Sequence, residues 1–297
     1  MKFTIAIPTH NNEDTIEDAL KSALNVDFDD FEVLISDTSN NDYTQKIVSS
    51  FVKDYEKKVK YFRNPFEWNM WQNHNFLLNE AKGDYVLFIH SDDSLLDDCL
   101  RILDLKLQSL NYPKRIVLCG ESLLYNFHGL IKDLGIPSET ILSGSSVIPI
   151  FLDGGLTPSG TLFSKDFSKS GYLFGNYVPS FSDCISMLYI IFKGYRFYFY
   201  DNIIFIRSFS SYVYSKLTKN DSRGTADLFN QYFTYSQLKI IIDFSFSYEA
   251  FGMTKFLFHN QIIKGYMKKR LRKRILKKPW LLFSKRYLQL IKYDLFM

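Results

Sequence analysis

The chain has 297 residues, of which 46% are hydrophobic and 17% aromatic, so it can bury a large core. Its three cysteines are widely spaced and form no CxxC or Cys/His cluster, which argues against a disulfide framework and a structural zinc site. No run of about 18 apolar residues occurs, so we expect no membrane span. The net charge is +4, yet residues 264–278 hold nine Lys or Arg and no acid, so the remainder is acidic on balance.

Strand-like and helix-like segments alternate along the first 110 residues. Short β-rich apolar runs predict four strands, at residues 2–8, 31–37, 58–64 and 84–90. Apolar residues at helical spacing predict helices at residues 11–25, 43–55, 73–83 and 94–110. This alternation predicts an α/β fold with a mainly parallel sheet flanked by helices on both faces.

Polar residues follow three of these strands at their carboxyl ends. Thr9 and His10 follow the first strand, Asp37 ends the second, and Asp92 and Asp93 come directly after the fourth. In open α/β sheets ligands bind beyond the carboxyl ends of the strands. We therefore expect these side chains to line one acidic crevice.

The adjacent carboxylates of Asp92 and Asp93 have two readings. Two neighbouring carboxylates repel each other, and a divalent cation such as Mg²⁺ or Mn²⁺ relieves that repulsion while it binds phosphate oxygens of a substrate. Alternatively, Ser91, Asp92 and Asp93 cap the helix expected at 94–110, since Ser and Asp are good N-cap residues. Both readings can hold together, because one residue can cap while its neighbour binds metal.

Three segments, in their order and spacing, resemble the nucleotide-binding half of family 2 glycosyltransferases with the GT-A fold. They are "IAIPTHNNEDTIEDALKSALN", "FEVLISDTSNND" and "WQNHNFLLNEAKGDYVLFIHSDDSL". The Asp-x-Asp motif of that family corresponds to His90-Ser91-Asp92 here, followed by Asp93, so the first Asp is replaced by His. The resemblance implies that Asp92 and Asp93 hold Mn²⁺ or Mg²⁺ and the ribose between them, without deciding which residue does which.

The resemblance also implies further nucleotide contacts. The first-strand motif would cradle the base with His10 stacked on uracil, Asp37 would contact the base or ribose, and an N-x-N segment would lie near the nucleotide. The residues concerned are Pro8, Thr9, His10, Asn11, Asp37, Asn73, His74 and Asn75. Each has a structural alternative: a surface-loop histidine for His10, a helix cap for Asp37 and helix-start residues for the segment 73–75.

Residues 154–210 resemble the acceptor-binding half of the same family more faintly. Ser182-Asp183 falls where the family has its catalytic acidic residue, which implies that Asp183 is the general base. The usual Glu-Asp pair is reduced to one carboxylate, and a helix cap is the alternative. Arg207 would contact the diphosphate or acceptor, or lie on the surface as an ordinary arginine.

From about residue 223 the chain changes character. We expect a catalytic domain at 1–222, with a nucleotide-binding half at 1–110 and an acceptor-binding half at 111–222, followed by a helical extension at 223–297. The basic, aromatic helices of this extension suit an anionic membrane surface. The alternatives are a solvated basic face and a helix pair packed on the catalytic domain. Phe, Leu and Ile between the cations suit lipid better than nucleic acid, so no nucleic acid partner is expected.

The sequence thus predicts a cytoplasmic enzyme, peripheral on the inner face of the cytoplasmic membrane. It would be an inverting, metal-dependent glycosyltransferase that moves a sugar from a nucleotide-sugar donor, a UDP-sugar, to a lipid-linked or polymeric glycan in cell-surface polysaccharide synthesis. One alternative is a non-catalytic scaffold, which the replacement at His90 and the single Asp183 keep open. A metal-dependent nucleotidyltransferase is the other, although "PTHNNEDT" lacks the Gly-rich, basic loop that it needs.

Overall fold

A computed structural model of the chain describes most of the sequence. The described residues are 1–123, 136–152, 158–172, 182–206, 229–248, 250, 253–254 and 257–296. The expected contact at Arg207 and the expected domain boundary at 222/223 lie outside them.

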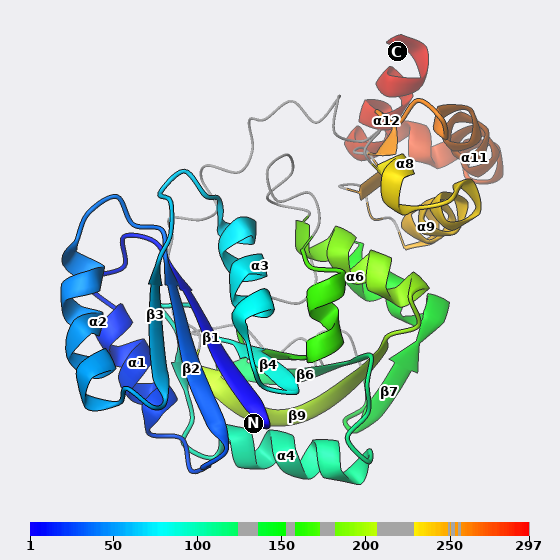
Figure 1. Cartoon of the computed structure of the whole chain (residues 1–297). Coiled ribbons are helices and arrows are strands. Elements are labelled where there is room, and N and C mark those ends of the chain that lie inside the picture. Colours follow the sequence, from blue (N-terminus) through cyan, green and yellow to red (C-terminus); the bar gives the residue numbers. More distant parts are fainter. Residues whose placement is uncertain are drawn as a thin grey trace.

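The first half of the chain forms the four expected strands and the helices between them (Figure 1). The strands are β1 (Phe3–Thr9), β2 (Phe31–Asp37), β3 (Val59–Arg63) and β4 (Tyr85–Phe88). The helices are α1 (Ile16–Leu24), α2 (Tyr43–Asp54) and α3 (Met70–Glu80). β1 pairs in parallel with β2 and β4, and β3 pairs in parallel with β2, so the carboxyl ends of all four strands lie at one edge.

The chain after β4 extends the same sheet with both parallel and antiparallel strands. It contributes β5 (Ser94–Leu95), β6 (Ile116–Leu123), β7 (Thr140–Ser143), β8 (Thr161–Ser164) and β9 (Arg196–Ile206). β8 runs antiparallel between β4 and β6, while β6 and β9 are parallel. The helical segments are α4 (Cys99–Ser109), η1 (Gly144–Phe151), η2 (Lys165–Lys169) and α6 (Ser182–Phe192). The predicted α/β fold is confirmed, with a mixed sheet in its second half.

Three helices begin at positions that differ from the prediction. The helix expected at 11–25 is α1, which begins at Ile16. The helix expected at 94–110 begins only at Cys99, because Ser94 and Leu95 instead pair as β5 with Ile206 and Phe205 of the distant strand β9. Ser91, Asp92 and Asp93 therefore do not cap it; Asp98 occupies the N-cap position.

The helix expected at 73–83 is α3, and it is displaced toward the N-terminus. It begins at Met70, where Asn69 and Gln72 form a capping box, and it ends at Glu80. The Asn69 side chain accepts hydrogen bonds from the amides of Trp71 (2.9 Å) and Gln72 (3.0 Å). Residues 73–75 thus lie inside the helix and are not helix-start residues.

The sheet is buried on both faces, as parallel strands with helical crossovers require. Successive side chains alternate between two cores. Ile5, Ile7 and Val33 face one core beneath α1, α2 and α4, whereas Ala6 and Leu34 face the other with α3 and α6. The strand ends are therefore held rigidly, which is what a precise binding site needs.

The C-terminal helices form a group beside the α6 end of the sheet (Figure 1). They are α8 (Phe229–Tyr232), α9 (Tyr235–Ser247), α11 (Lys264–Lys277), η5 (Pro279–Phe283) and α12 (Lys285–Phe296). α9 buries Leu238 and Ile242 in the same core as α6, and Phe233 contacts Phe192 of α6 ring to ring. Part of the extension thus packs on the sheet domain. Among the described residues, no helix is both long enough and apolar enough to cross a bilayer.

Candidate active site

Hydrogen bonds join the loops that follow β1 and β2. The Thr38 amide donates to the Thr9 carbonyl (3.1 Å), and Nδ1 of His10 donates to the Thr38 carbonyl (2.8 Å). The Asn11 amide donates to Oγ of Ser39 (2.7 Å), with Asn11 at φ 51°, a region that Asn tolerates better than most residues. Pro8 pairs with Ser36 one step before the loops. The residues predicted to cradle the base are therefore held together in one rigid unit.

Asp37 is fully buried at the carboxyl end of β2, and its carboxylate accepts four hydrogen bonds. The donors are the amide (2.7 Å) and hydroxyl (2.5 Å) of Ser39, the hydroxyl of Tyr61 (2.6 Å) and Nη1 of Arg63 (2.8 Å). Burial, followed by the hydrogen bond to Asp37, raises the pKa of Tyr61 above its ordinary range. Asp37 does not cap a helix, since α2 starts later with Asp42 at its N-cap.

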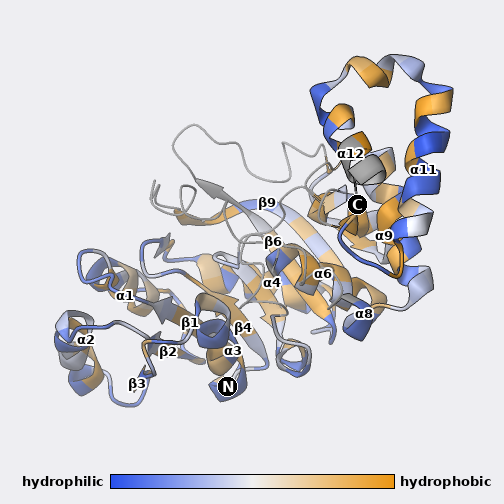
Figure 2. Ribbon diagram, turned by 90° about the horizontal axis from the view of Figure 1, so that it is seen from above, coloured by the Kyte–Doolittle hydropathy of each residue, from blue (hydrophilic) through white to orange (hydrophobic). Residues whose placement is uncertain are grey.

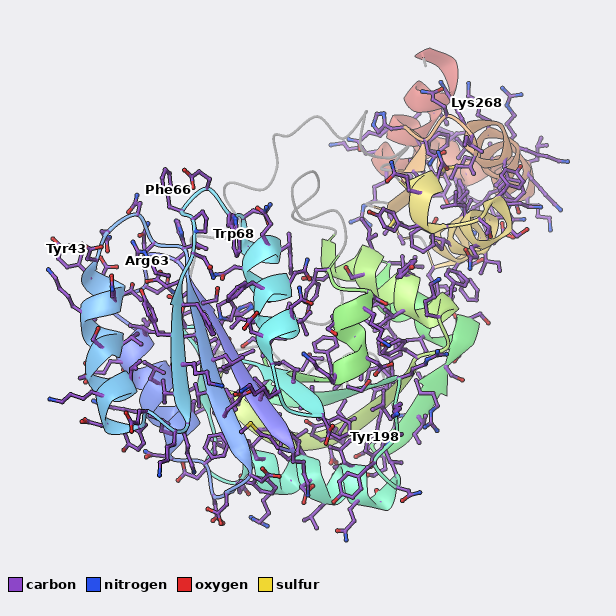
Figure 3. The ribbon with its side chains drawn as sticks, in the orientation of Figure 1. Tyr43, Arg63, Phe66, Trp68, Tyr198 and Lys268 are labelled. Carbon is purple, nitrogen blue, oxygen red and sulfur yellow. The ribbon has the colours of Figure 1, made fainter. Side chains whose placement is uncertain are left out.

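Arg63 is a functional candidate that the sequence reasoning missed. Its Nη2 also donates to the Ser39 carbonyl (2.6 Å) and the Asn41 carbonyl (2.7 Å), so it ties β3 to the loop after β2. Figure 3 shows Arg63 at the same rim as Phe66 and Trp68. The sequence could have indicated Arg63 as a site residue, because it ends the third predicted strand, and the carboxyl ends of all four parallel strands lie at one edge.

Asn73 and Asn75 point in different directions from α3. Nδ2 of Asn73 donates to the carbonyls of Thr9 (3.2 Å) and Ser36 (3.0 Å), and so joins the ends of β1 and β2. Its Oδ1 and the hydroxyl of Thr9 are buried without a hydrogen-bond partner among the described residues. Asn75 instead holds the main chain of Tyr172, accepting from its amide (2.7 Å) and donating to its carbonyl (3.1 Å).

His74 is buried and its tautomer is determined by its contacts. Nδ1 donates to the Met70 carbonyl (2.7 Å), so in the neutral ring Nε2 carries the lone pair. Nε2 lies 3.3 Å from Nε2 of His90, which must then donate the proton in that contact. Burial, and secondarily the neighbouring His90, lowers the pKa of His74 to about 3, so the ring is neutral at pH 7.

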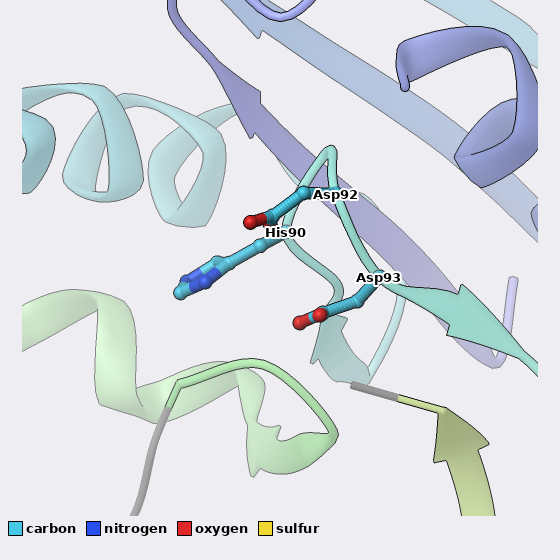
Figure 4. A group of neighbouring side chains, drawn as sticks. All are labelled: His90, Asp92 and Asp93. Atoms are coloured by element: carbon cyan, nitrogen blue, oxygen red, sulfur yellow. The ribbon is translucent and has the colours of Figure 1, made fainter. Parts of the chain in front are cut away.

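His90, Asp92 and Asp93 form a cluster just beyond β4 (Figure 4). One potential ligand atom from each lies within 4.8 Å of the others. The Ser159 hydroxyl donates to Oδ2 of Asp93 (2.5 Å) and accepts from the His90 amide (3.0 Å), which orients the cluster. The Asp92 carboxylate accepts no hydrogen bond from the rest of the described chain. One imidazole and two carboxylates are a donor set for a divalent first-row metal ion.

Ser159 depends on the glycine that follows it. Gly160 has φ +76°, its amide donates to the Phe88 carbonyl (2.8 Å), and an added Cβ would lie 2.0 Å from the Phe205 ring. Only glycine fits there without displacing either the β4 end or the Phe205 ring of β9.

Replacement of Gly160 by alanine will therefore destabilise the protein more than the matched change Gly144→Ala. Gly144 also has positive φ (+57°) but nothing within 4 Å of its Cβ position, so alanine there costs only the backbone strain of about 1–2 kcal/mol. At Gly160 overpacking adds about 1–3 kcal/mol. Urea unfolding measures both free energies, and equal losses would contradict the tight packing described for Gly160.

Asp183 lies in the first turn of α6. Its carboxylate interacts with Tyr172, which in turn contacts residues of α3. Burial, and secondarily the charge of Asp183, raises the pKa of Tyr172 well above its ordinary value. The Tyr172 ring in turn contacts Trp71 (5.0 Å between centroids) and His74 (5.6 Å). The buried ring of Tyr172 thus interacts both with Asp183, the predicted general base, and with His74 of the His74–His90 pair.

The sequence profile described as "Glycosyl transferase family 2" matches residues 4–123, the part that carries the strand ends just described. Residues 4–123 thus carry a domain of this family. A curated relative from Campylobacter jejuni, "GalNAc(5)-diNAcBac-PP-undecaprenol beta-1,3-glucosyltransferase", is 27% identical over 244 residues, 76% of this chain and 77% of that protein. A poly(ribitol-phosphate) beta-glucosyltransferase from Bacillus spizizenii is 32% identical over 34% of this chain and 16% of that protein. Abequosyltransferase RfbV from Salmonella typhimurium is 34% identical over 37% of this chain and 33% of that protein.

Solved structures of glycosyltransferases share the GT-A fold of this chain. Staphylococcus aureus TarS 1–349 in complex with UDP-GlcNAc superposes with a TM-score of 0.59 at 16% identity, over 87% of this chain and 72% of that one. A mannosyltransferase from Pyrobaculum calidifontis in complex with GDP-Man and Mn²⁺ gives 0.56 at 13% identity, over 99% and 86%. The protein is thus a glycosyltransferase with a family 2 domain at residues 4–123, and its relatives are named as enzymes of bacterial glycan synthesis.

Proposed function

We propose that the protein transfers a sugar from a UDP-sugar to a lipid-linked or polymeric glycan, with inversion at the anomeric carbon and with a divalent metal. The observation that carries the proposal is the His90–Asp92–Asp93 cluster beside the joined loops after β1 and β2. TarS, a structural neighbour, binds UDP and UDP-GlcNAc in its solved complexes, which supports the choice of donor.

The nucleotide would lie across the ends of β1 and β2. The segment Pro8–Asn11 would cradle the base, with His10 as the stacking surface. The buried Thr9 hydroxyl and Asn73 Oδ1 lack partners among the described residues, and a bound nucleotide would supply them. The Asp37 carboxylate already accepts four hydrogen bonds, so it would act on the nucleotide indirectly. It would do so by holding Arg63 in place, and Arg63 would make the contact with the nucleotide.

The residues present fit a divalent cation. His90, Asp92 and Asp93 would hold it, and His74 would orient the His90 ring, as the hydrogen-bond partners of ligating histidines do at metal sites. A nitrogen ligand favours Mn²⁺ over Mg²⁺, which takes mainly oxygen ligands. When bound, the cation would stabilise the charge of the departing diphosphate as a Lewis acid.

Asp183 would act as the general base. It would accept the proton of the acceptor hydroxyl as that oxygen attacks the anomeric carbon from the face opposite the diphosphate. Attack from that face inverts the configuration. The buried Tyr172, held by Asn75, would keep Asp183 at a constant distance from the donor site.

Thermal unfolding with UDP and Mn²⁺ tests this function. We expect UDP with Mn²⁺ to raise the unfolding midpoint by more than the separate effects of UDP and Mn²⁺ combined, because a ligand that binds only the folded state stabilises it. Addition of a chelator should remove the extra stabilisation. If neither ligand shifts the midpoint, alone or together, the non-catalytic scaffold is the better account.

The domain organisation completes the proposal. Residues 1–222 would form the catalytic domain, and 223–297 would hold it on the inner face of the cytoplasmic membrane. The name of the C. jejuni relative gives it a PP-undecaprenol-linked glycan, which supports a membrane-borne acceptor for this chain.

A further inference from the structure

A cavity of about 180 Å³ lies among the C-terminal helices, away from the strand ends. Phe246 of α9 lines it on one side and four cations of α11 line it on the other: Arg270, Lys273, Arg274 and Lys277. Their spacing of three, four and seven residues places all four on one face of the helix. The cavity is therefore strongly positive.

Two of the four cations are already held in position by their neighbours. Nε of Arg270 pairs with Oδ1 of Asp243 at 2.8 Å, and Nε of Arg274 donates to the Tyr287 hydroxyl at 2.5 Å. Lys273 and Lys277 form no ion pair with any acid in the described part of the chain. Four cations around one cavity repel each other, and a bound anion relieves that repulsion.

The size of the cavity limits the anion. Its volume of about 180 Å³ lies below the ~300–1,000 Å³ of usual small-molecule sites. A phosphate or diphosphate group fits this space. Arginine forks and lysine ammonium groups are the side chains that bind such groups.

Large apolar side chains stand exposed in the chain segment that adjoins the cavity-lining cations. Leu276 is 81% exposed, Trp280 63% and Phe283 89%, and they follow or adjoin Lys277 along α11 and η5. Figure 2 shows hydrophilic and hydrophobic stretches alternating along the ribbon around α11. Exposed Trp, Phe and Leu beside cations suit the headgroup–acyl boundary of a bilayer.

We propose that this cavity binds the phosphomonoester or diphosphate headgroup of a membrane lipid, with Leu276, Trp280 and Phe283 entering the bilayer interface. Such a site differs from diffuse attraction to a charged surface, because it distinguishes one lipid headgroup from another of equal charge density. It rests on the membrane attachment included in the proposed function, but it involves no residue of the proposed nucleotide site, so it can fail while UDP and Mn²⁺ binding remain.

Vesicle co-sedimentation of the full chain tests the site. The vesicles would be phosphatidylcholine mixed with phosphatidic acid, which ends in a phosphomonoester, or with phosphatidylserine, a phosphodiester, at matched surface potential. The double variant Lys273→Ala/Lys277→Ala is compared with Lys269→Ala/Lys278→Ala, which removes the same charge from exposed positions outside the cavity.

We expect wild-type protein to prefer phosphatidic acid vesicles. The control should lose at most the roughly thirtyfold that two surface cations at about 1 kcal/mol each contribute, and the cavity variant should lose about tenfold more than the control. Trp280 fluorescence should shift to the blue on binding, and Trp280→Phe should remove that shift. Both double variants should keep the wild-type unfolding midpoint and its response to UDP with Mn²⁺.

Four results would overturn the proposal. Equal losses in the two double variants, or equal binding to both anionic vesicles, would show attraction without a site. Inorganic pyrophosphate binding as tightly as the vesicles would assign the cavity to a soluble anion. Tighter binding to an RNA oligonucleotide than to vesicles would assign the basic face to nucleic acid.

Discussion

The Asp183→Asn variant is expected to transfer sugar about 10²–10⁴-fold more slowly than the wild type, with its affinity for UDP and Mn²⁺ unchanged. The amide keeps the shape of the carboxylate but cannot accept the acceptor's proton. Asp183 lies in the first turn of α6, next to buried Tyr172, and is not part of the His90–Asp92–Asp93 cluster. Initial rates of transfer and UDP titrations measure the two effects separately.

The matched control for this variant is Asp201→Asn, which removes an exposed carboxylate elsewhere in the same half of the chain. It should leave both the rate and the affinity unaltered. Normal turnover by Asp183→Asn would rule out its role as the base. A parallel loss of UDP binding would assign Asp183 to the donor site instead.

The Asp93→Asn variant is expected to bind Mn²⁺ in the presence of UDP at least about 100-fold more weakly, and to lose transfer activity with it. Asp93 is only 3% exposed and accepts the Ser159 hydroxyl at 2.5 Å, so its carboxylate has one orientation. An amide of the same shape offers a neutral and weaker oxygen ligand. Calorimetric titration with Mn²⁺ measures this loss directly.

Asp97→Asn provides the comparison, since Asp97 is an exposed acid a few residues along the same segment. Its Mn²⁺ affinity should match the wild type. Undiminished affinity in Asp93→Asn would place the metal elsewhere. A lower unfolding midpoint without ligands would instead show that Asp93 acts through the fold.

Much of the nucleotide-binding half was predictable because its signals are local. β1 to β4 are short apolar runs, and their periodicity requires no knowledge of distant partners. The placement of polar residues at their carboxyl ends follows from parallel pairing alone, so a crevice lined by Thr9, Asp37 and Asp92 could be expected from local patterns.

Other features were not predictable, because they depend on pairs far apart in the chain. β5 replaces the start of the expected helix since Ser94 and Leu95 meet β9, more than a hundred residues away. Ser159 reaches Asp93 across 66 residues, and Asn75 holds Tyr172 across 97. No local pattern contains such contacts.

The order of strands and helices, the acidic strand ends and the basic character of the last segment could be predicted from the sequence, because periodicity and charge are properties of neighbouring residues. Which polar atoms already have hydrogen-bond partners could be learned only from the folded chain. There the Asp37 carboxylate binds Arg63 and Tyr61, His90 lies with the two aspartates, and four cations of α11 line one cavity. Those outcomes depend on how the backbone folds back on itself, since a hydrogen bond or a cavity exists only when distant segments come within a few ångströms of each other.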